Sequence, residues 1–199
     1  MKHLIIYAHP NQESLNGQFK QAIEKILVQQ KQDVIVRDLY TLGFDPVLSL
    51  EDMTGQRKGI VNEFIKNEQE YIKWADIVTF IYPIWWTGMP AIMKGYIDRV
   101  FSYGFAYRYD QGIQKGLLTG KQAIILNTHG KSNEEYSTIG MDKALLLTSD
   151  KGIYTYCGFQ VTEHFFFDKA DRATPEVIEI WLSKIRDLYT IMNPQLSNY

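Results

Sequence analysis

Residues 77–90 read IVTFIYPIWWTGMP, and this stretch decides which fold the chain can adopt. Residues 77–82 form an unbroken apolar run apart from Thr79, which predicts a strand buried on both faces. Apolar residues then recur at helical spacing over 89–101, with Pro90 near the first turn, where proline is tolerated. Because ligands of parallel α/β sheets bind beyond the carboxyl ends of the strands, two tryptophans in this turn suggest a flat aromatic ligand.

The same alternation of strands and helices extends along the whole chain. Strands are expected at residues 4–8, 33–39, 76–82, 120–127 and 157–162. Helices are expected after Ser14, a candidate N-cap, and at residues 60–75, 89–101, 137–152 and 171–189. The start of the last helix is marked by Thr174 as N-cap and Pro175 at the first position. Residues 40–58 have no clear period and predict a long rim loop. We therefore expect one domain over residues 1–199, a three-layer α/β fold with a doubly wound, five-stranded parallel sheet in the order 2-1-3-4-5.

Composition limits the possible partners. A net charge of −2 and a pI near 6.1 disfavour nucleic-acid binding, and no basic cluster predicts a membrane-surface patch. The single cysteine, Cys157, excludes an internal disulfide and fits a reducing compartment. Without a signal peptide or an apolar run of about 18 residues, we expect a cytoplasmic protein. No His, Cys and carboxylate cluster has ligand spacing, so no metal is expected.

Three loops leave the ends of strands that the expected order makes neighbours, at residues 9–16, 83–87 and 127–136. They should converge on one crevice whose chemistry matches a flavin mononucleotide. The phosphate would lie at the first helix N-terminus, where N–H groups and the helix dipole favour anions, near Ser14, Leu15 and Asn16. The ring would lie against Ile84, Trp85 and Trp86, and backbone groups of residues 128–130 would bind its edge.

Structural roles that involve no ligand also remain open for several of these side chains. Trp85 and Trp86 also fit a core or a dimer interface. Tyr107 and Tyr109 also fit the cover of a sheet edge. Asp98 and Arg99 are expected to form a solvated or interface charge pair, and Cys157 an inert core thiol in the last strand.

A set of short motifs, in order along nearly the whole chain, resembles the NAD(P)H:quinone oxidoreductase (DT-diaphorase) family of flavodoxin-like flavoproteins, in its short bacterial form. The central motif, residues 83–95 (PIWWTGMPAIMKG), is the one specific to this family. The others are His9 with Ser14-Leu15-Asn16, Asp38-Leu39-Tyr40, Phe44-Asp45-Pro46, Arg99-Val100-Phe101, Phe105-Ala106-Tyr107, Thr128-His129-Gly130 and Cys157-Gly158-Phe159.

The resemblance implies hydride transfer from NAD(P)H through bound FMN, with FAD as the alternative, to a quinone or related acceptor, in a homodimer. It implies flavin contacts from His9, Leu15, Asn16, Ile84, Trp85, Trp86, Thr87, Asn127, Thr128, His129 and Gly130; Ser14 and Pro83 complete the expected cofactor site. It places Tyr107 and Tyr109 at the substrate pocket and makes Tyr136 a catalytic residue that steadies charge in the reduced ring.

The chain also departs from the animal members of that family. Residues 127–130 read NTHG where animal members carry TTGG, and residues 139–142 occupy the region of the histidine that partners the tyrosine matched by Tyr136. The long C-terminal extension of the animal enzymes is absent, which favours FMN over FAD.

Two other functions remain open. Some short bacterial members are ancillary reductases of potassium-efflux systems, so a regulatory subunit with a membrane-protein partner is one alternative. A flavodoxin-type electron carrier is the other, although such carriers are typically strongly acidic and this chain is nearly neutral.

Overall fold

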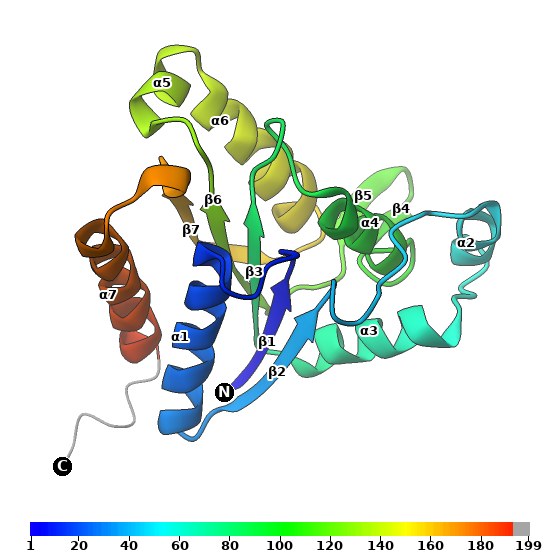
Figure 1. The fold of residues 1–199 in the computed structure, drawn as a ribbon. Coiled ribbons are helices and arrows are strands. Elements are labelled where there is room, and N and C mark those ends of the chain that lie inside the picture. Colours follow the sequence, from blue (N-terminus) through cyan, green and yellow to red (C-terminus); the bar gives the residue numbers. More distant parts are fainter. Residues whose placement is uncertain (193–199) are drawn as a thin grey trace.

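The computed structural model describes residues 1–192, and these form a five-stranded parallel sheet with helices on both faces (Figure 1). The strands, in sheet order, are β2 (Asp33–Asp38), β1 (Lys2–Tyr7), β3 (Ile77–Pro83), β6 (Gln122–Thr128) and β7 (Gln160–Phe167). Because β6 and β7 are the fourth and fifth strands of this sheet along the chain, the expected order 2-1-3-4-5 is confirmed. Residues 193–199, the end of the expected domain, lie outside the described residues.

The helices divide between the two faces of the sheet. They are α1 (Leu15–Gln29), α2 (Leu50–Gln56), α3 (Glu63–Trp74), α4 (Ala91–Val100), α5 (Asn133–Thr138), α6 (Met141–Leu146), the π-helix η1 (Leu147–Thr155), the 3₁₀ turn η2 (Ala170–Arg172) and α7 (Pro175–Ile191). Figure 1 shows α1 and α7 side by side on one face, and α5 and α6 beyond the carboxyl ends of the strands. Within residues 1–192, no helix is both long and apolar enough to cross a membrane.

Strand alternation builds a separate hydrophobic core on each face. Leu4 and Ile6 of β1 face the core formed with α3 and α4, whereas Ile5 and Tyr7 face the core formed with α1 and α7. All four side chains are fully buried. A central strand buried on both faces must be apolar throughout, which is why the continuous run in β3 was a reliable signal.

Side-chain caps mark the residues at which these helices begin. Ser14 accepts a hydrogen bond from the Gly17 N–H and begins α1, and Thr174 caps α7 with Pro175 at its first position, both as the sequence predicts. The helix expected at 89–101 begins two residues later, at Ala91, so Pro90 is the N-cap of α4 and lies just before its first turn.

Two segments differ from the sequence-based expectation. The expected loop at 40–58 contains α2, which Ser49 begins with a capping box involving Asp52. The expected last strand at 157–162 instead runs from Gln160 to Phe167, with an irregularity in its pairing to β6 near Ala123. Cys157 therefore lies in the turn before the strand, where burial raises the pKa of its thiol to about 12.

Beyond α4, the chain leaves the sheet in a separate hairpin, and β4 (Tyr107–Asp110) pairs antiparallel with β5 (Ile113–Gly116). The segment at 105–109 was expected as a loop or a short strand, and its strand character comes from this pairing. The expected helix at 137–152 is divided among α5, α6 and η1.

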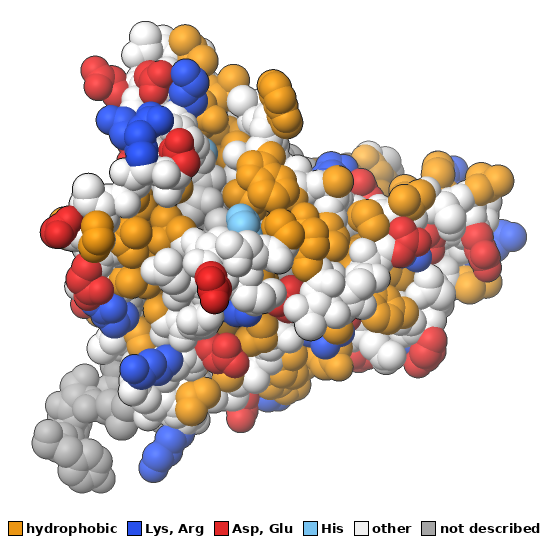
Figure 2. All heavy atoms as spheres, viewed as in Figure 1, with side chains coloured by type: hydrophobic (Ala, Val, Ile, Leu, Met, Phe, Trp, Pro, Cys, Tyr) orange, Lys and Arg blue, Asp and Glu red, His pale blue; other side chains and the backbone are white. Residues whose placement is uncertain are grey.

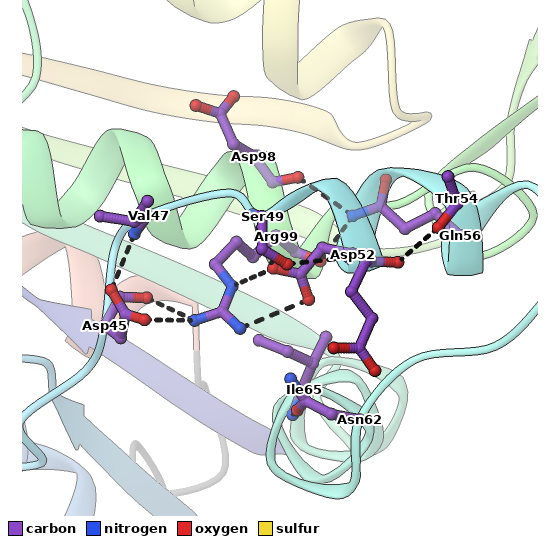
Figure 3. Close-up of polar contacts among 11 residues, drawn as sticks. Asp45, Val47, Ser49, Asp52, Thr54, Gln56, Asn62, Ile65, Asp98 and Arg99 are labelled. Carbon is purple, nitrogen blue, oxygen red and sulfur yellow. Dashed lines mark hydrogen bonds and ion pairs between the residues drawn. The ribbon is translucent and has the colours of Figure 1, made fainter.

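The expected charge pair of Asp98 and Arg99 does not form. Asp98 pairs with Lys94 at the surface, whereas the Arg99 side chain is 10% exposed and turns toward the loop before α2 (Figure 3). Its Nε donates to Asp52 Oδ2 at 3.0 Å, and its Nη1 donates to the Asp45 carbonyl at 2.6 Å. Burial alone would raise the pKa of Asp52, but the Ser49 N–H and the Arg99 guanidinium outweigh it and hold this pKa below its usual range. One side chain thus ties the 45–52 segment to α4.

We expect Arg99→Met to lower the free energy of unfolding by about 2 kcal/mol, because Asp52 loses its charged partner while remaining largely buried. The Asp52 pKa is depressed in the folded state, so its stabilisation is present above its unfolded value near 4 and is lost as pH falls through the folded value. Urea unfolding at pH 7 and pH 3 measures both effects, and the variant should lose less stability on acidification than the wild type.

Lys94→Met is the matched control, since it breaks only the exposed Lys94–Asp98 pair on the same helix, which is expected to contribute less than about 1 kcal/mol. Equal losses in the two variants would contradict the structural role of Arg99.

Candidate functional site

The loops after β1, β3 and β6 meet at the carboxyl edge of the sheet around a cavity of about 260 Å³. Its lining includes most of the expected cofactor residues: His9, Ser14, Leu15, Asn16, Pro83, Ile84, Trp85, Thr128, His129 and Gly130, together with Ala170 and Asp171. These residues lie where the strand order reverses, between β1 and β3, which is the usual ligand position in such sheets.

His9 closes the first side of the cavity. Its Nδ1 lies 3.0 Å from both the backbone nitrogen and the carbonyl oxygen of Asn11, and its ring centroid is 5.8 Å from that of Trp85. Burial lowers the pKa of His9, against an opposing contribution from the Asn11 backbone.

The N-terminus of α1 forms the floor. Leu15 and Asn16 lie in the first turn, where N–H groups lack acceptors within the helix. Asn16 is 2% exposed, and its Nδ2 donates to Thr128 Oγ1 at 2.8 Å, which joins the loops after β1 and β6. Its Oδ1 is buried without a partner. Gly17 permits this packing, since a Cβ there would lie 2.0 Å from the Gln12 carbonyl oxygen.

The tryptophan turn is strained. Trp85 and Gly88 exchange backbone hydrogen bonds in a two-residue hairpin turn, which forces positive φ angles of 51° on Trp86 and 58° on Thr87. Such angles are costly for bulky and β-branched residues and cluster at functional sites. The turn separates the two indoles: Trp85 lines the cavity, whereas Trp86 is 100% exposed.

The loop after β6 uses much of its backbone internally. The His129 N–H donates to the Phe167 carbonyl and is therefore not free for a ligand, and the Thr128 carbonyl already accepts one hydrogen bond, from the Ile84 N–H. Fewer backbone groups of this loop are therefore available for the expected contacts with the edge of the ring.

A histidine does lie beside Tyr136, although not where the family pattern would put it. The rings of His129 and Tyr136 stack with centroids 4.7 Å apart and an interplanar angle of 11°. Both residues are largely buried, and burial lowers the pKa of His129, opposed in part by the Asn133 side chain. Tyr136 packs against Ile84 beneath the cavity wall. The sequence spacing gave no signal for this pair, because the contact arises from the fold of the loop.

Two expected cofactor residues face a second cavity of about 480 Å³ beside the first. Thr87 and Asn127 line it together with Tyr82, Met89, Leu145 and Ser149. The Asn127 carboxamide is fully engaged, since its Nδ2 donates to the Tyr82 carbonyl and its Oδ1 contacts His164 Nε2. Its side chain is therefore turned away from the cavity at the α1 N-terminus.

Tyr107 and Tyr109 lie elsewhere in the same chain. They line a third, open groove of about 750 Å³ with Phe101, Tyr103 and Tyr156, and the Tyr109 and Tyr156 hydroxyls are 3.1 Å apart. The structure thus does not bring these two tyrosines together with the cavity at the α1 N-terminus of their own chain.

Ala170 and Asp171 are the two lining residues that the sequence did not predict. They follow β7. Ending the last strand at 162 left Ala170 in the expected connection and placed Asp171 at the start of the expected last helix. The aromatic run His164-Phe165-Phe166-Phe167 was the available signal for a longer strand. Among residues 1–192, no three His, Cys, Asp or Glu side chains form a group that could hold a metal ion.

Comparison with known proteins gives consistent matches. A family model described as "Flavodoxin-like fold" matches residues 1–191. An uncharacterized NAD(P)H oxidoreductase of Haemophilus influenzae is 40% identical over 185 residues, covering 89% of this chain and 92% of that protein. NAD(P)H dehydrogenase [quinone] 1 of Rattus norvegicus is 31% identical, covering 94% of this chain and 77% of that protein. The structure of an NAD(P)H:quinone oxidoreductase from Methanothermobacter marburgensis superposes with a TM-score of 0.81 at 26% identity, covering 96% of this chain and 98% of that one.

Proposed function

The chain belongs to the flavodoxin-like fold family, and from this membership and the geometry of the site we propose that it is a flavin-dependent NAD(P)H oxidoreductase. Its acceptor is a quinone or a related small molecule, as the names of its relatives suggest. The observation that carries the proposal is the meeting of a helix N-terminus and an aromatic turn in one cavity at the switch point of the sheet. Bound flavin supplies the redox chemistry, and the protein positions it.

The floor of the cavity suits a single phosphate. Ser14, Leu15 and Asn16 present a hydroxyl and helix N–H groups there, and no lysine or arginine is among the described lining residues. One helix N-terminus without a cation fits a monophosphate better than a pyrophosphate, which favours FMN over FAD. The unpaired Asn16 Oδ1 is placed to accept a hydrogen bond from a ribityl hydroxyl.

The wall of the cavity suits the ring. Ile84 and Trp85 offer an apolar and aromatic surface, and the His9 ring adds a polar group at its edge. Trp86, fully exposed at the tip of the strained turn, is free to cover an acceptor that enters above. Tyr136, stacked beneath His129, remains our candidate for steadying charge on the reduced ring.

Purified protein should be yellow and should oxidise NADPH in the presence of menadione. The measurement is an absorbance spectrum of the protein as isolated, identification of the released flavin by chromatography, and a steady-state assay. A colourless protein that FMN does not reconstitute would refute the proposal, and a stable semiquinone during reductive titration would indicate an electron carrier instead.

Asn16→Asp should weaken FMN binding by about tenfold, because a carboxylate beside the phosphate adds like-charge repulsion, and should affect riboflavin much less. Gln18→Glu, which adds the same charge at an exposed position of α1, is the control and should leave the affinity nearly unchanged. Fluorescence titration with both flavins measures this difference. Equal losses for FMN and riboflavin would contradict a phosphate at the α1 N-terminus.

The acceptor site is proposed to be completed by a second copy of the chain. The groove that holds Tyr107 and Tyr109 is rich in exposed apolar side chains, among them Met53 at 50% and Tyr109 at 53%. Figure 2 shows hydrophobic side chains gathered along the upper rim from the centre of the view toward α2. Since these tyrosines lie away from the α1 cavity of their own chain, a homodimer is the arrangement in which they border a flavin.

Light scattering after gel filtration should therefore give twice the 23.2 kDa chain mass. Tyr109→Ala should raise the KM for menadione about fivefold, a loss of roughly 1 kcal/mol of contact. Ile180→Ala, on the exposed surface of α7, is the control. A monomer with an unchanged KM in the tyrosine variant would rule out a shared site.

A further inference from the structure

One charged side chain lines the cavity at the α1 N-terminus, and its sign is unfavourable for an anionic cofactor. It is Asp171, and among the described residues no lysine, arginine or second carboxylate lines this cavity. Asp171 belongs to the turn η2, which joins β7 to α7. The proposed function gives this carboxylate no role.

The turn that carries Asp171 is fixed against the loop after β6. The Ala170 N–H donates to the His129 carbonyl at 3.0 Å. The Arg172 side chain adds a second contact, because its Nη2 donates to the Gly130 carbonyl at 3.2 Å. These bonds hold the residues on both sides of Asp171, so its backbone stays at the edge of the cavity although its side chain is 63% exposed.

The carboxylate lies between this loop and a guanidinium. A Cβ on Gly130 would lie 3.5 Å from Asp171 Oδ1, so this oxygen faces the loop that lines the cavity. The other oxygen, Oδ2, is 3.6 Å from Arg172 Nη1. Arginine is a common ligand of phosphate groups, but this guanidinium is engaged with a carbonyl and a carboxylate of its own chain. Toward the cavity, the turn consequently presents negative and not positive charge.

Asp171 approaches the cavity from the same face of the sheet as the proposed phosphate position. The helices α1 and α7 are in contact on that face, and η2 leads directly into α7 (Figure 1). Residues 14–16, at the start of α1, and Asp171 both line the cavity. A group that extends from a phosphate at the α1 N-terminus toward η2 therefore approaches this carboxylate.

The two candidate cofactors differ only beyond the phosphate position. FMN and FAD are identical as far as the first phosphate, and in FAD a second phosphate and an adenosine follow. A protein can therefore distinguish them through groups that lie past the first phosphate. Discrimination of this kind can come from a charge that repels the unwanted ligand. Like charges a few ångströms apart repel each other even near a protein surface, although salt weakens the repulsion.

We propose that Asp171 is a specificity-determining residue, which favours the monophosphate FMN over the dinucleotide FAD by placing a negative charge beside the position of the second phosphate of FAD. This inference rests on the proposed function. The first phosphate binds to N–H groups of α1 in either cofactor, so Asp171 acts mainly on the part that FAD alone carries. Because the carboxylate is exposed to solvent, it contributes a preference of about fivefold and not an absolute block.

The test compares three flavins that share the ring and the ribityl chain: riboflavin has no phosphate, FMN has one and FAD has two. Asp171→Asn keeps the shape of the side chain and removes its charge. The variant should bind FAD about fivefold more tightly than the wild type does, FMN less than about twofold more tightly, and riboflavin equally well. Fluorescence titration of the apoprotein measures the three affinities, and the gain for FAD should largely disappear in about 1 M NaCl.

Asp187→Asn is the matched control, because it removes the same charge from an exposed position of α7 away from the cavity. It should leave the ratio of the FMN and FAD affinities unchanged. Equal gains for FMN and FAD in Asp171→Asn would mean that the carboxylate acts on any anion, and would overturn the proposal. Weaker binding of all three flavins would show that Asp171 supports the ribityl chain or the loop, and would overturn it as well.

The same titrations separate this inference from the proposed function. A wild-type protein that binds none of the three flavins would refute the flavin-dependent function and the role of Asp171 together. A wild-type protein that binds FMN and FAD equally well would refute the selectivity and leave the oxidoreductase function standing. The expected result is a wild-type preference for FMN that is reduced by Asp171→Asn and retained by Asp187→Asn.

Discussion

The parallel pairing of β3 between β1 and β6 is the constraint on which the rest of the structure depends. Tyr7 pairs with Ile81, and Pro83 pairs with Thr128, so the three strands end at nearly the same level. Their exit loops consequently open onto one cavity. Because a sheet buried on both faces tolerates almost no polar side chain along its strands, the polar and aromatic groups of these elements gather at their ends.

The site depends on a rigid rim as well as on the sheet. The hairpin turn at Trp86-Thr87 holds two residues at positive φ, and this geometry separates one indole facing the cavity from one facing solvent. Asn16 and Thr128 join the first loop to the third. Arg99 secures the 45–52 segment on the side of the groove that Tyr107 and Tyr109 line. The turn keeps its strained backbone angles because the contacts around it hold it in that conformation.

The charged groups around the candidate cavity lie where the sequence gave least reason to expect them. The cavity proposed for an anionic cofactor has no basic side chain among its described lining residues, so helix N–H groups must serve there. Behind it, Asp150, His164 and Asn127 lie in hydrogen-bond contact with one another, in a chain that reaches the end of β6. Asp150 comes from a π-helix, a rare form that often occurs at functional sites.

The sequence by itself determined the sheet order, the caps Ser14 and Thr174 and most of the cavity lining, because buried parallel strands and helix starts leave local patterns. The helix at 50–56 carried a local signal, the Ser49–Asp52 capping box, which hydrophobic periodicity does not register. Tertiary structure alone decided the extent of β7, the burial of Arg99 and the stacking of His129 on Tyr136. It also joined Asp150, His164 and Asn127. The physical reason is that each of these features is a contact between separate segments of the chain. Hydrophobic periodicity describes one segment at a time and does not predict such contacts.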